Sequence, residues 1–328
     1  MSKPAATIKL FPTDFFVAEQ LDFALSGTGE HLWCCVEKTG LNTAWIKREW
    51  ARLLGCAAKD IAHSGLKDRH AVTQQWLSLP AKYGDRLPDS GEGWRIIERS
   101  LNERKLRVGS HRHNRFILIL RDVEGERNII DSTLHKMAQE GFTNHFGTQR
   151  FGHSNRETAR HWVARGQLPK QRDERAQVLS TLRADCFNAQ LDTRHAAGLL
   201  TVPQPGDRAM LSGSNSHFAI EIVDEALLAR LAGGDIALGG WLPGKRKVPL
   251  PPMVQQWLAA ADAEMQATVH YLERHAEDGW RSLTVRPQAF SHEWIDTHVL
   301  RLSFILPRGS YATTLLNSVF TVREAASP

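Results

Sequence analysis

Apolar side chains recur along this chain in patterns that predict strands near both ends. Residues 31–38 are rich in strand-forming side chains and end at a turn, and residues 75–79 form a second short run of the same kind. The apolar run at 115–122 has charged ends, which is typical of a buried strand. Residues 298–306 alternate between apolar and polar, so we expect a strand with one face in water.

Helical spacing predicts helices between these strands. Asn42 is placed to cap a helix that ends at Gly55, because Asn accepts free N–H groups of a first turn and Gly readily adopts the left-handed conformation after a last turn. The same reasoning predicts helices over 128–140, 154–166 and 173–200.

The middle of the chain differs in character from its ends. A turn-rich block with Gly, Pro, Ser and Asn close together lies at 202–218 and returns at 239–244. A chain of 328 residues is long enough for two domains. Strand-rich ends around a different middle therefore predict that one domain interrupts another.

Composition restricts the class of protein. Hydrophobic residues make up 42% of the chain, which argues against disorder, and no apolar run fits a membrane-spanning helix or a secretory signal. We therefore expect a cytoplasmic protein with no membrane partner. The cysteines include no C-x-x-C pair, and adjacent Cys34 and Cys35 would point to opposite faces of a strand, so we expect core cysteines rather than disulfides or a cysteine-bound zinc.

The net charge is compatible with a polyanionic partner without demanding one. The 41 basic residues exceed the 36 acidic ones, for a net charge of +5. Residues 102–116 contain five Arg or Lys and two His, which suits a surface that follows phosphates, although a solvated sheet edge fits equally well. His111 and His113 lack an apparent third metal ligand, so solvated or phosphate-facing imidazoles are favoured over a metal site.

The segment with the clearest chemical potential lies at 64–76. Asp68 stands between Lys67 and Arg69 in a loop that leads into the strand at 75–79. Two neighbouring cations favour the ionised carboxylate that a nucleophile or general base requires, and they could hold phosphates on either side of a nucleotide. On the residues alone, however, an Asp in such a loop is more often part of a surface ion cluster.

A resemblance to a known family adds to this picture. The run G-L-K-D-R-H-A-V-T-Q-Q-W at 65–76 resembles the active-site motif of the TruD family of tRNA pseudouridine synthases. Further segments match that family in the same order: D-F-F-V-A-E at 14–19, G-E-H-L-W at 29–33 with V-E-K-T-G-L-N-T at 36–43, K-L-R-V-G at 105–109 with H-N-R-F at 113–116, N-H-F-G-T-Q-R-F-G at 144–152, G-D at 206–207 with L-S-G-S at 211–214, and L-P-R-G-S-Y-A-T at 306–313. Because the matches span essentially the whole chain, it is identified as a member of that family.

The resemblance implies an isomerase that uses neither a cofactor nor a metal. Pseudouridine formation breaks the N1–C1′ bond of a uridine, turns the uracil and joins C5 to C1′, so no electron or group enters or leaves. The chain also lacks a glycine-rich dinucleotide or phosphate loop. By analogy the partner is tRNA, the target is the uridine at position 13 in the D arm, and the enzyme is a monomer that requires no protein partner. A base inside an RNA stem must be flipped out to be reached.

The same resemblance implies roles for individual residues. Asp68 is the catalytic carboxylate, acting either on C1′ or as the base at C2′. Asn114 orients Asp68 by a hydrogen bond, and Phe116 stacks on the uracil. Judged without the family, Asn114 is more often a turn residue and Phe116 more often a core residue.

A second group of residues is expected to bind the substrate: Lys67, Arg69, Glu19, Gln149, Arg150 and Phe151. Glu19 is either an acid at the edge of the site or a salt-bridge partner of its cations. Arg150 either clamps a phosphate or pairs with an acid at a hinge. His113 and His145 depart from the family pattern, which usually has Gly and Tyr there, and we expect changes in rate or positioning rather than loss of activity.

The resemblance also predicts the fold and leaves two other functions to weigh. We expect an α+β protein whose catalytic domain, residues 1–153 and 286–328, has a long mixed or antiparallel sheet with helices, and whose inserted domain at 154–285 completes a V shape with a basic cleft for RNA. A tRNA-binding or folding chaperone of the same fold is the main alternative, although an intact Asp68 argues against it. A methyltransferase would need a nucleotide-cofactor loop, and none is visible.

Overall fold

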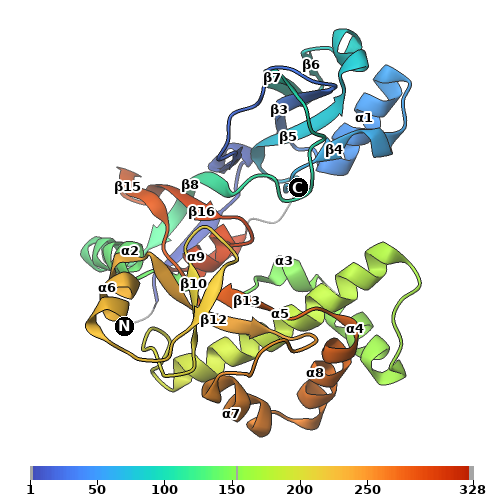
Figure 1. Ribbon diagram of the computed structural model, residues 1–328. Helices are drawn as coiled ribbons and strands as arrows, with labels where there is room; N and C mark the ends of the chain where they lie inside the picture. Colours follow the sequence, from blue (N-terminus) through green and yellow to red (C-terminus); the bar gives the residue numbers. More distant parts are fainter. Residues whose placement is uncertain (1–2, 153, 325–328) are drawn as a thin grey trace. The chain divides into compact units, whose positions relative to one another are not determined.

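The strands predicted near the two ends of the chain meet in one sheet. The computed structural model describes residues 3–152 and 154–324, which divide into two compact units (Figure 1). Unit 2 contains Gln139–Arg286 and Thr313–Ser318, and the remaining described residues form unit 1. The domain ranges predicted from the sequence stay predictions.

Unit 1 is built on a mixed sheet, which has eleven strands in the described part of the chain. Its main path is β15-β16-β8-β2-β5-β3-β7-β6, while β1 pairs with β8 and β17 and β4 pairs with β5. The β1–β17 and β2–β5 pairs are parallel. The strands are β1 (Ala5–Ile8), β2 (Phe15–Gln20), β3 (His31–Thr39), β4 (Ala62–His63), β5 (Val72–Pro80), β6 (Ser90–Gly91), β7 (Trp94–Asn102), β8 (His113–Glu124), β15 (Gln288–Asp296), β16 (Val299–Pro307) and β17 (Thr321–Glu324). This sheet, together with the helices, confirms the predicted α+β class.

Helix α1 (Thr43–Leu54) covers one face of β3 and β5, and its ends are those that the sequence predicts. The Asn42 side chain accepts a hydrogen bond from the N–H of Trp45, and Gly55 closes the helix with a φ of 63°. Cys34 packs in the core beneath α1, whereas Cys35 packs with Trp33 in a second cluster. The two cysteines therefore face opposite sides of β3, as expected.

Strand β8 lies between β16 and β2 in the sheet, so the polar residues at its start are beside both of these strands. The strand extends beyond the predicted 115–122 at both ends, and Asn114, Phe116, Leu118 and Leu120 are buried along one face. Asn114 is the register partner of Glu19 on one side and of Leu306 on the other. The sheet thus brings segments from three distant parts of the sequence together at the start of β8.

Unit 2 combines a four-stranded sheet with a bundle of helices. The sheet order is β11-β10-β12-β13, and a short β9–β14 pair lies apart from it. Helix α5, predicted at 173–200, packs against α4, α7 and α8 (Figure 1). Trp241 and Tyr271 are buried in the core of these helices. The elements are β9 (Phe142–Thr143), α3 (Thr148–Phe151), α4 (Asn155–Arg165), α5 (Arg172–Ala196), β10 (Arg208–Leu211), β11 (His217–Ala219), α6 (Glu225–Gly233), β12 (Ile236–Leu242), α7 (Pro252–Ala260), α8 (Ala263–His275), β13 (Gly279–Ser282) and β14 (Thr284–Val285).

Two further helices include residues of both units. They are α2 (Arg127–Glu140), which confirms the helix predicted at 128–140, and α9 (Ala312–Val319). No helix in the described ranges is long and apolar enough to cross a membrane. The cysteines Cys34, Cys35, Cys56 and Cys186 are free thiols.

The prediction of turns at 239–244 is wrong for its first four residues. Strand β12 runs to Leu242 and includes Gly239 and Gly240. A Cβ atom at Gly240 would lie 2.7 Å from Cε2 of Phe187 on α5, so the helix packs against the strand only because this position lacks a side chain. The glycines here serve close packing rather than a turn.

We predict that unit 2 depends on the buried ion pair between Arg194 and Asp207. Their side chains are 7% and 3% exposed and 2.5 Å apart. Asp207→Ala leaves a buried guanidinium without its counter-charge, so we expect the free energy of unfolding to fall by about 3–5 kcal/mol in chemical denaturation. The exposed pair Arg230–Asp235 in the same unit is the control, and Asp235→Ala should cost less than about 1 kcal/mol. Equal losses from the two variants would contradict the prediction.

Candidate active site

The loop that carries Asp68 lies between β4 and β5 and is anchored through its backbone. The N–H of Lys67 donates to Oγ1 of Thr43, the first residue of α1, at 3.1 Å. The Thr43 hydroxyl in turn donates to Oε1 of Gln75 at 2.9 Å. The ammonium of Lys38 donates to the carbonyl oxygen of Asp68 at 3.1 Å. The carboxylate is therefore presented by a loop that is tied to both a helix and a buried strand.

The counter-charge of Asp68 is Lys9, which the sequence interpretation did not identify. The Lys9 ammonium lies 2.7 Å from Oδ2 of Asp68, and the N–H of His70 donates to Oδ1 at 3.1 Å. Lys9 follows β1 with a φ of 57°, and its side chain is only 7% exposed. Because 59 residues separate the two partners, no local pattern in the sequence indicates this pair.

Electrostatics at Asp68 favour the ionised form. Burial alone would raise the pKa of this carboxyl, but the hydrogen bond and charge of Lys9, followed by the His70 N–H, outweigh it and hold the pKa below its ordinary value. The side chain nevertheless keeps 29% of its surface exposed. Asp68 is thus a charged and accessible carboxylate, as a nucleophile or general base requires.

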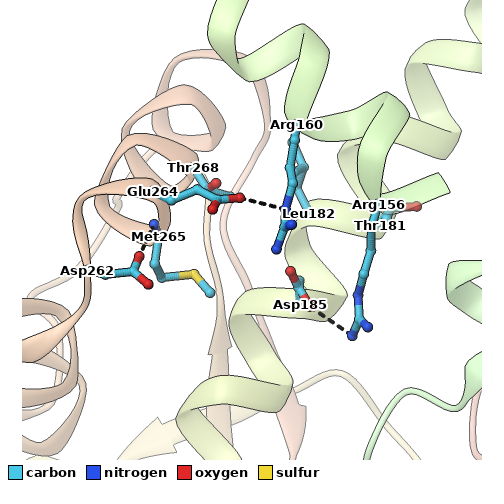
Figure 2. A pocket seen from close by; sticks show the side chains of 9 residues that line it. All are labelled: Arg156, Arg160, Thr181, Leu182, Asp185, Asp262, Glu264, Met265 and Thr268. Carbon is cyan, nitrogen blue, oxygen red and sulfur yellow. Dashed lines mark hydrogen bonds and ion pairs between the residues drawn. The ribbon is translucent and has the colours of Figure 1, made fainter. Parts of the chain in front are cut away.

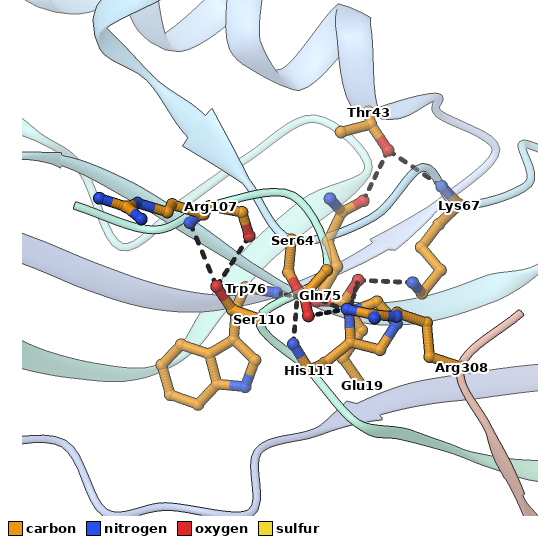
Figure 3. Close-up of polar contacts among 11 residues, drawn as sticks. Glu19, Thr43, Ser64, Lys67, Gln75, Trp76, Arg107, Ser110, His111 and Arg308 are labelled. Carbon is orange, nitrogen blue, oxygen red and sulfur yellow. Dashed lines mark hydrogen bonds and ion pairs between the residues drawn. The ribbon is translucent and has the colours of Figure 1, made fainter. Parts of the chain in front are cut away.

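The sequence neighbours of Asp68 have other partners. The Lys67 ammonium lies 2.5 Å from Oε1 of Glu19, and Nε of Arg69 donates to the carbonyl of Gly40 at 3.0 Å. Oε2 of Glu19 accepts a hydrogen bond from the N–H of Trp76 at 2.8 Å. Of the two roles predicted for Glu19, the structure therefore shows the salt bridge (Figure 3). The acid has no exposed side-chain surface. Burial raises the pKa of Glu19, and the charge of Lys67 opposes that effect.

The expectation of a solvated or phosphate-facing imidazole is wrong for His111, which is 3% exposed and completes this buried cluster as a neutral histidine. Nδ1 of His111 lies 2.5 Å from Oγ of Ser64 and 3.6 Å from Oε1 of Glu19 (Figure 3). Burial, with the charges of Lys67 and Arg308, lowers the pKa of His111 to about 3. The ring is therefore uncharged at neutral pH and forms no ion pair with Glu19.

Lys38 is a fully buried lysine beside the Asp68 loop. Only 1% of its surface is exposed, and its ammonium donates to the carbonyl of Leu41 at 2.5 Å as well as to that of Asp68. Burial lowers its pKa to about 8, although the charge of Asp68 acts in the opposite direction. The lysine thus joins two backbone segments at the site, and no carboxylate in the described part of the chain pairs with it directly.

Asn114 and Phe116 lie on β8, where the resemblance predicts substrate contacts. Asn114 is 9% exposed, and its Oδ1 has no hydrogen-bond partner in the described part of the chain. Within the same ranges, no hydrogen bond joins Asn114 to Asp68. The Phe116 ring is 7% exposed and stacks on Phe304 at 5.3 Å between centroids, with Phe15 at its edge. The structure therefore shows Phe116 in a packed aromatic row.

The other predicted substrate-binding residues belong to unit 2. The Arg150 guanidinium lies 5.6 Å from the ring centroid of Phe146, and its buried Nε has no partner among the described residues. The Phe151 ring is buried beneath the guanidinium of Arg156 at 3.7 Å. The side chain of Gln149 lies outside the residues that the structure describes.

A small pocket of about 50 Å³ lies between α4, α5 and α8 of unit 2 (Figure 2). Arg160 pairs with Glu264 at 2.6 Å, and Arg156 pairs with Asp185 at 2.9 Å. Both arginines of the pocket have acidic partners, so it is a structural ion-pair site rather than a candidate for phosphate binding.

Comparison with known proteins identifies relatives along the whole chain. The family model described as tRNA pseudouridine synthase D (TruD) matches residues 4–179 and 175–319. The tRNA pseudouridine synthase D of Xanthomonas campestris is 37% identical over 98% of this chain and 93% of its own length. That of Nitrosococcus oceani is 35% identical over 98% of this chain and 92% of its own length.

A solved structure shares the fold. The putative tRNA pseudouridine synthase D from Methanosarcina mazei superposes with a TM-score of 0.71 and covers 98% of this chain and 95% of its own. Its sequence identity is 18%, so this likeness concerns the architecture. It confirms the predicted fold class.

We predict that Lys9→Met raises the pKa of Asp68, because burial then acts on the carboxyl without the opposing charge and hydrogen bond of Lys9. The measurement is a ¹³C NMR titration of the aspartate carboxyl groups, with Asp68→Asn used to assign the resonance. Lys82→Met, which removes an exposed lysine near Tyr83, is the matched control. The ion pair also stabilises the folded protein at pH values above the pKa of an aspartate in the unfolded chain. This contribution to stability is lost as the pH falls through the lowered pKa of Asp68 in the folded protein. An unchanged titration in Lys9→Met would contradict the assignment.

We predict that Lys38 makes stability pH-dependent in the alkaline range. Since the folded protein loses the proton near pH 8 and the unfolded chain near 10.5, the unfolded state binds more protons between these values, and stability should rise with pH. The free energy of unfolding of the wild type, relative to Lys38→Met, should increase by about 3 kcal/mol from pH 8 to 10.5, at about 1.4 kcal/mol per pKa unit. Urea denaturation at several pH values measures it, and parallel pH profiles for the two proteins would refute it.

Proposed function

The chain belongs to the tRNA pseudouridine synthase D (TruD) family, and from that premise we propose that Asp68 is the carboxylate with which it isomerises uridine 13 in the D arm of tRNA. As a member of this family, the protein is an isomerase that converts uridine in tRNA to pseudouridine. The position of the target and the role of Asp68 are the proposed parts, and the resemblance of the 65–76 segment supports both.

The contrast between Asp68 and Glu19 carries the proposal. Both acids belong to segments that resemble the family's motifs, but Glu19 has no exposed side-chain surface and is held by Lys67 and the Trp76 N–H. Asp68 is 29% exposed and is kept ionised by Lys9. A reacting group must reach the substrate, so Asp68 is the acid suited to chemistry and Glu19 is suited to hold the loop.

The chemistry requires the ionised form of Asp68 by either route. As a nucleophile, a carboxylate oxygen attacks C1′ while the N1–C1′ bond breaks; as a base, it takes the proton from C2′. In both cases the uracil then turns and C5 bonds to C1′, which regenerates Asp68: in the first route its bond to C1′ breaks, and in the second the proton returns to C2′. The hydrogen on C5 is released to solvent while N1 gains one. The N–H of His70 at Oδ1 and the ammonium of Lys9 at Oδ2 also fix the orientation of the Asp68 carboxylate.

Asn114 and Phe116 are proposed to act on the nucleotide from β8. The buried Oδ1 of Asn114 has no partner among the described residues, so it is an acceptor available to a donor on the bound substrate, and an unsatisfied buried acceptor is costly without one. Phe304 and Phe15 hold the Phe116 ring, so uracil stacking at this site would use a ring that is already fixed in orientation. These contacts support substrate positioning, whereas the covalent step is assigned to Asp68.

The test is tritium release from tRNA that carries [5-³H]uridine, since the C5 hydrogen leaves in the reaction. We predict release by the wild type without added cofactor and a loss of at least about 100-fold in rate for Asp68→Asn, as expected for an essential acid–base or nucleophilic group. Asp89→Asn, which changes an exposed aspartate paired with Arg99, is the control and should keep full activity.

Three outcomes separate the possibilities in this experiment. Pseudouridine mapping of the product by chemical labelling and primer extension should place the modification at position 13, and another position would refute that part of the proposal. Release by Asp68→Asn at the wild-type rate would show that a different residue is catalytic. If the wild type binds tRNA but releases no tritium from any tRNA, the chaperone alternative is favoured.

A further inference from the structure

Two aliphatic side chains beside the Asp68 loop are almost fully exposed to water. Leu66, two residues before Asp68, is 76% exposed, and Val108 is 77% exposed. Among the large hydrophobic side chains in the described ranges, these are the two highest values. Single exposed apolar residues are common on protein surfaces, so position and surroundings decide whether these two have a role.

The loops that carry Leu66 and Val108 are joined through their backbones. The N–H of Gly109 donates to the carbonyl of Ser64 at 2.6 Å, and the N–H of His111 donates to Oγ of Ser64 at 2.9 Å (Figure 3). Arg308 also donates to the carbonyl of Gly109. Each exposed side chain is therefore within two residues of this connection, and both are presented from fixed backbone rather than from a loose loop.

Gly65 keeps the first of these loops close to the buried cluster. A Cβ atom at this position would lie 2.9 Å from Cε1 of His111 and 3.0 Å from both Oε1 of Glu19 and Nζ of Lys67. The backbone thus packs directly on charged and polar groups that are themselves fixed. This packing restrains the backbone directly before Leu66, whose side chain is exposed at the surface.

Four exposed cations, for which the described residues provide no acidic partner, lie within four residues of Leu66 or Val108 in the sequence. They are Arg69 on the Asp68 loop and Arg104, Lys105 and Arg107 on the Val108 loop, all exposed. In the described part of the chain, no carboxylate lies within ion-pair distance of any of them. Elsewhere in unit 1, arginines such as Arg95 and Arg121 do pair with acids. Unpaired cations around an apolar pair match a ligand with phosphates outside and flat apolar surfaces inside, which is the character of a nucleic-acid helix.

From this arrangement we infer that Leu66 and Val108 form an apolar wedge, which enters the RNA base stack and occupies the space left by the target uridine. The inference rests on the proposed function, because only an enzyme that must remove a base from its stack needs such a wedge. The wedge side chains contact the neighbouring bases, and the surrounding cations bind the phosphates on either side. Asp68, two residues after Leu66, then meets the nucleotide that has been displaced.

The test compares the double variant Leu66→Ala/Val108→Ala with the wild type on folded tRNA. A 2-aminopurine placed next to the target uridine reports unstacking, because its fluorescence rises when it loses a stacking neighbour. We expect the wild type to raise the fluorescence on binding and the double variant to lose most of that rise. The single-turnover rate of pseudouridine formation should fall at least tenfold, while tRNA affinity changes less than threefold.

Matched variants keep the result interpretable. Ile222→Ala removes a 74% exposed aliphatic side chain from unit 2 and should change neither signal. Leu66→Met/Val108→Ile retains apolar bulk and should restore the fluorescence rise and most of the rate. Thermal melts verify that every variant is folded.

The outcomes that overturn the wedge differ from those that overturn the proposed function. Wild-type fluorescence and rate in the double variant would refute the wedge, and so would a loss of affinity with an unchanged fluorescence rise, which indicates simple docking. Asp68→Asn should raise the fluorescence but form pseudouridine at least about 100-fold more slowly than the wild type. If the wild type itself forms no pseudouridine, the proposed function fails, whatever the variants do.

Discussion

The ion pair between Lys9 and Asp68 is the interaction on which the site depends. A carboxylate that is partly withdrawn from water would bind its proton more tightly, and the ammonium of Lys9 reverses that tendency. The position of Lys9 in turn depends on β1, which is held between β8 and the C-terminal strand β17. The ends of the chain and the Asp68 loop are thus linked through one charge pair, and the sheet is what sets its geometry.

The buried acids and bases near Asp68 have structural roles, and Asp68 is the group that is free to react. Glu19 and Lys67 neutralise each other, His111 is uncharged, and Lys38 bonds to backbone carbonyls. Each of these groups restrains the loop or the strand behind it. Asp68 alone in this cluster combines a lowered pKa with substantial exposure. This division explains how several ionisable groups in a small volume can give one accessible carboxylate.

Local chemistry allowed much of the fold to be predicted from the sequence. The cap at Asn42, the glycine at 55 and the alternation in β16 depend on neighbouring residues, so they could be identified in the chain itself. The partner of Asp68 could not, because Lys9 reaches it only through strand pairing. Adjacent Lys67 was expected to support the charge of Asp68, but its long side chain extends to Glu19. At Gly240, the requirement for glycine comes from Phe187 on another element, and the sequence therefore resembled a turn.

The central claim is that Asp68 is the group that meets the displaced nucleotide. The most direct measurement is a structure of the protein bound to tRNA with 5-fluorouridine at the target position, where fluorine replaces the hydrogen that must leave C5. We predict a flipped-out nucleotide with an oxygen of Asp68 about 3–3.5 Å from C1′ or C2′, or bonded to the sugar, and with Lys9 still beside Asp68. A nucleotide that remains stacked, or one that approaches a different acid, would contradict it.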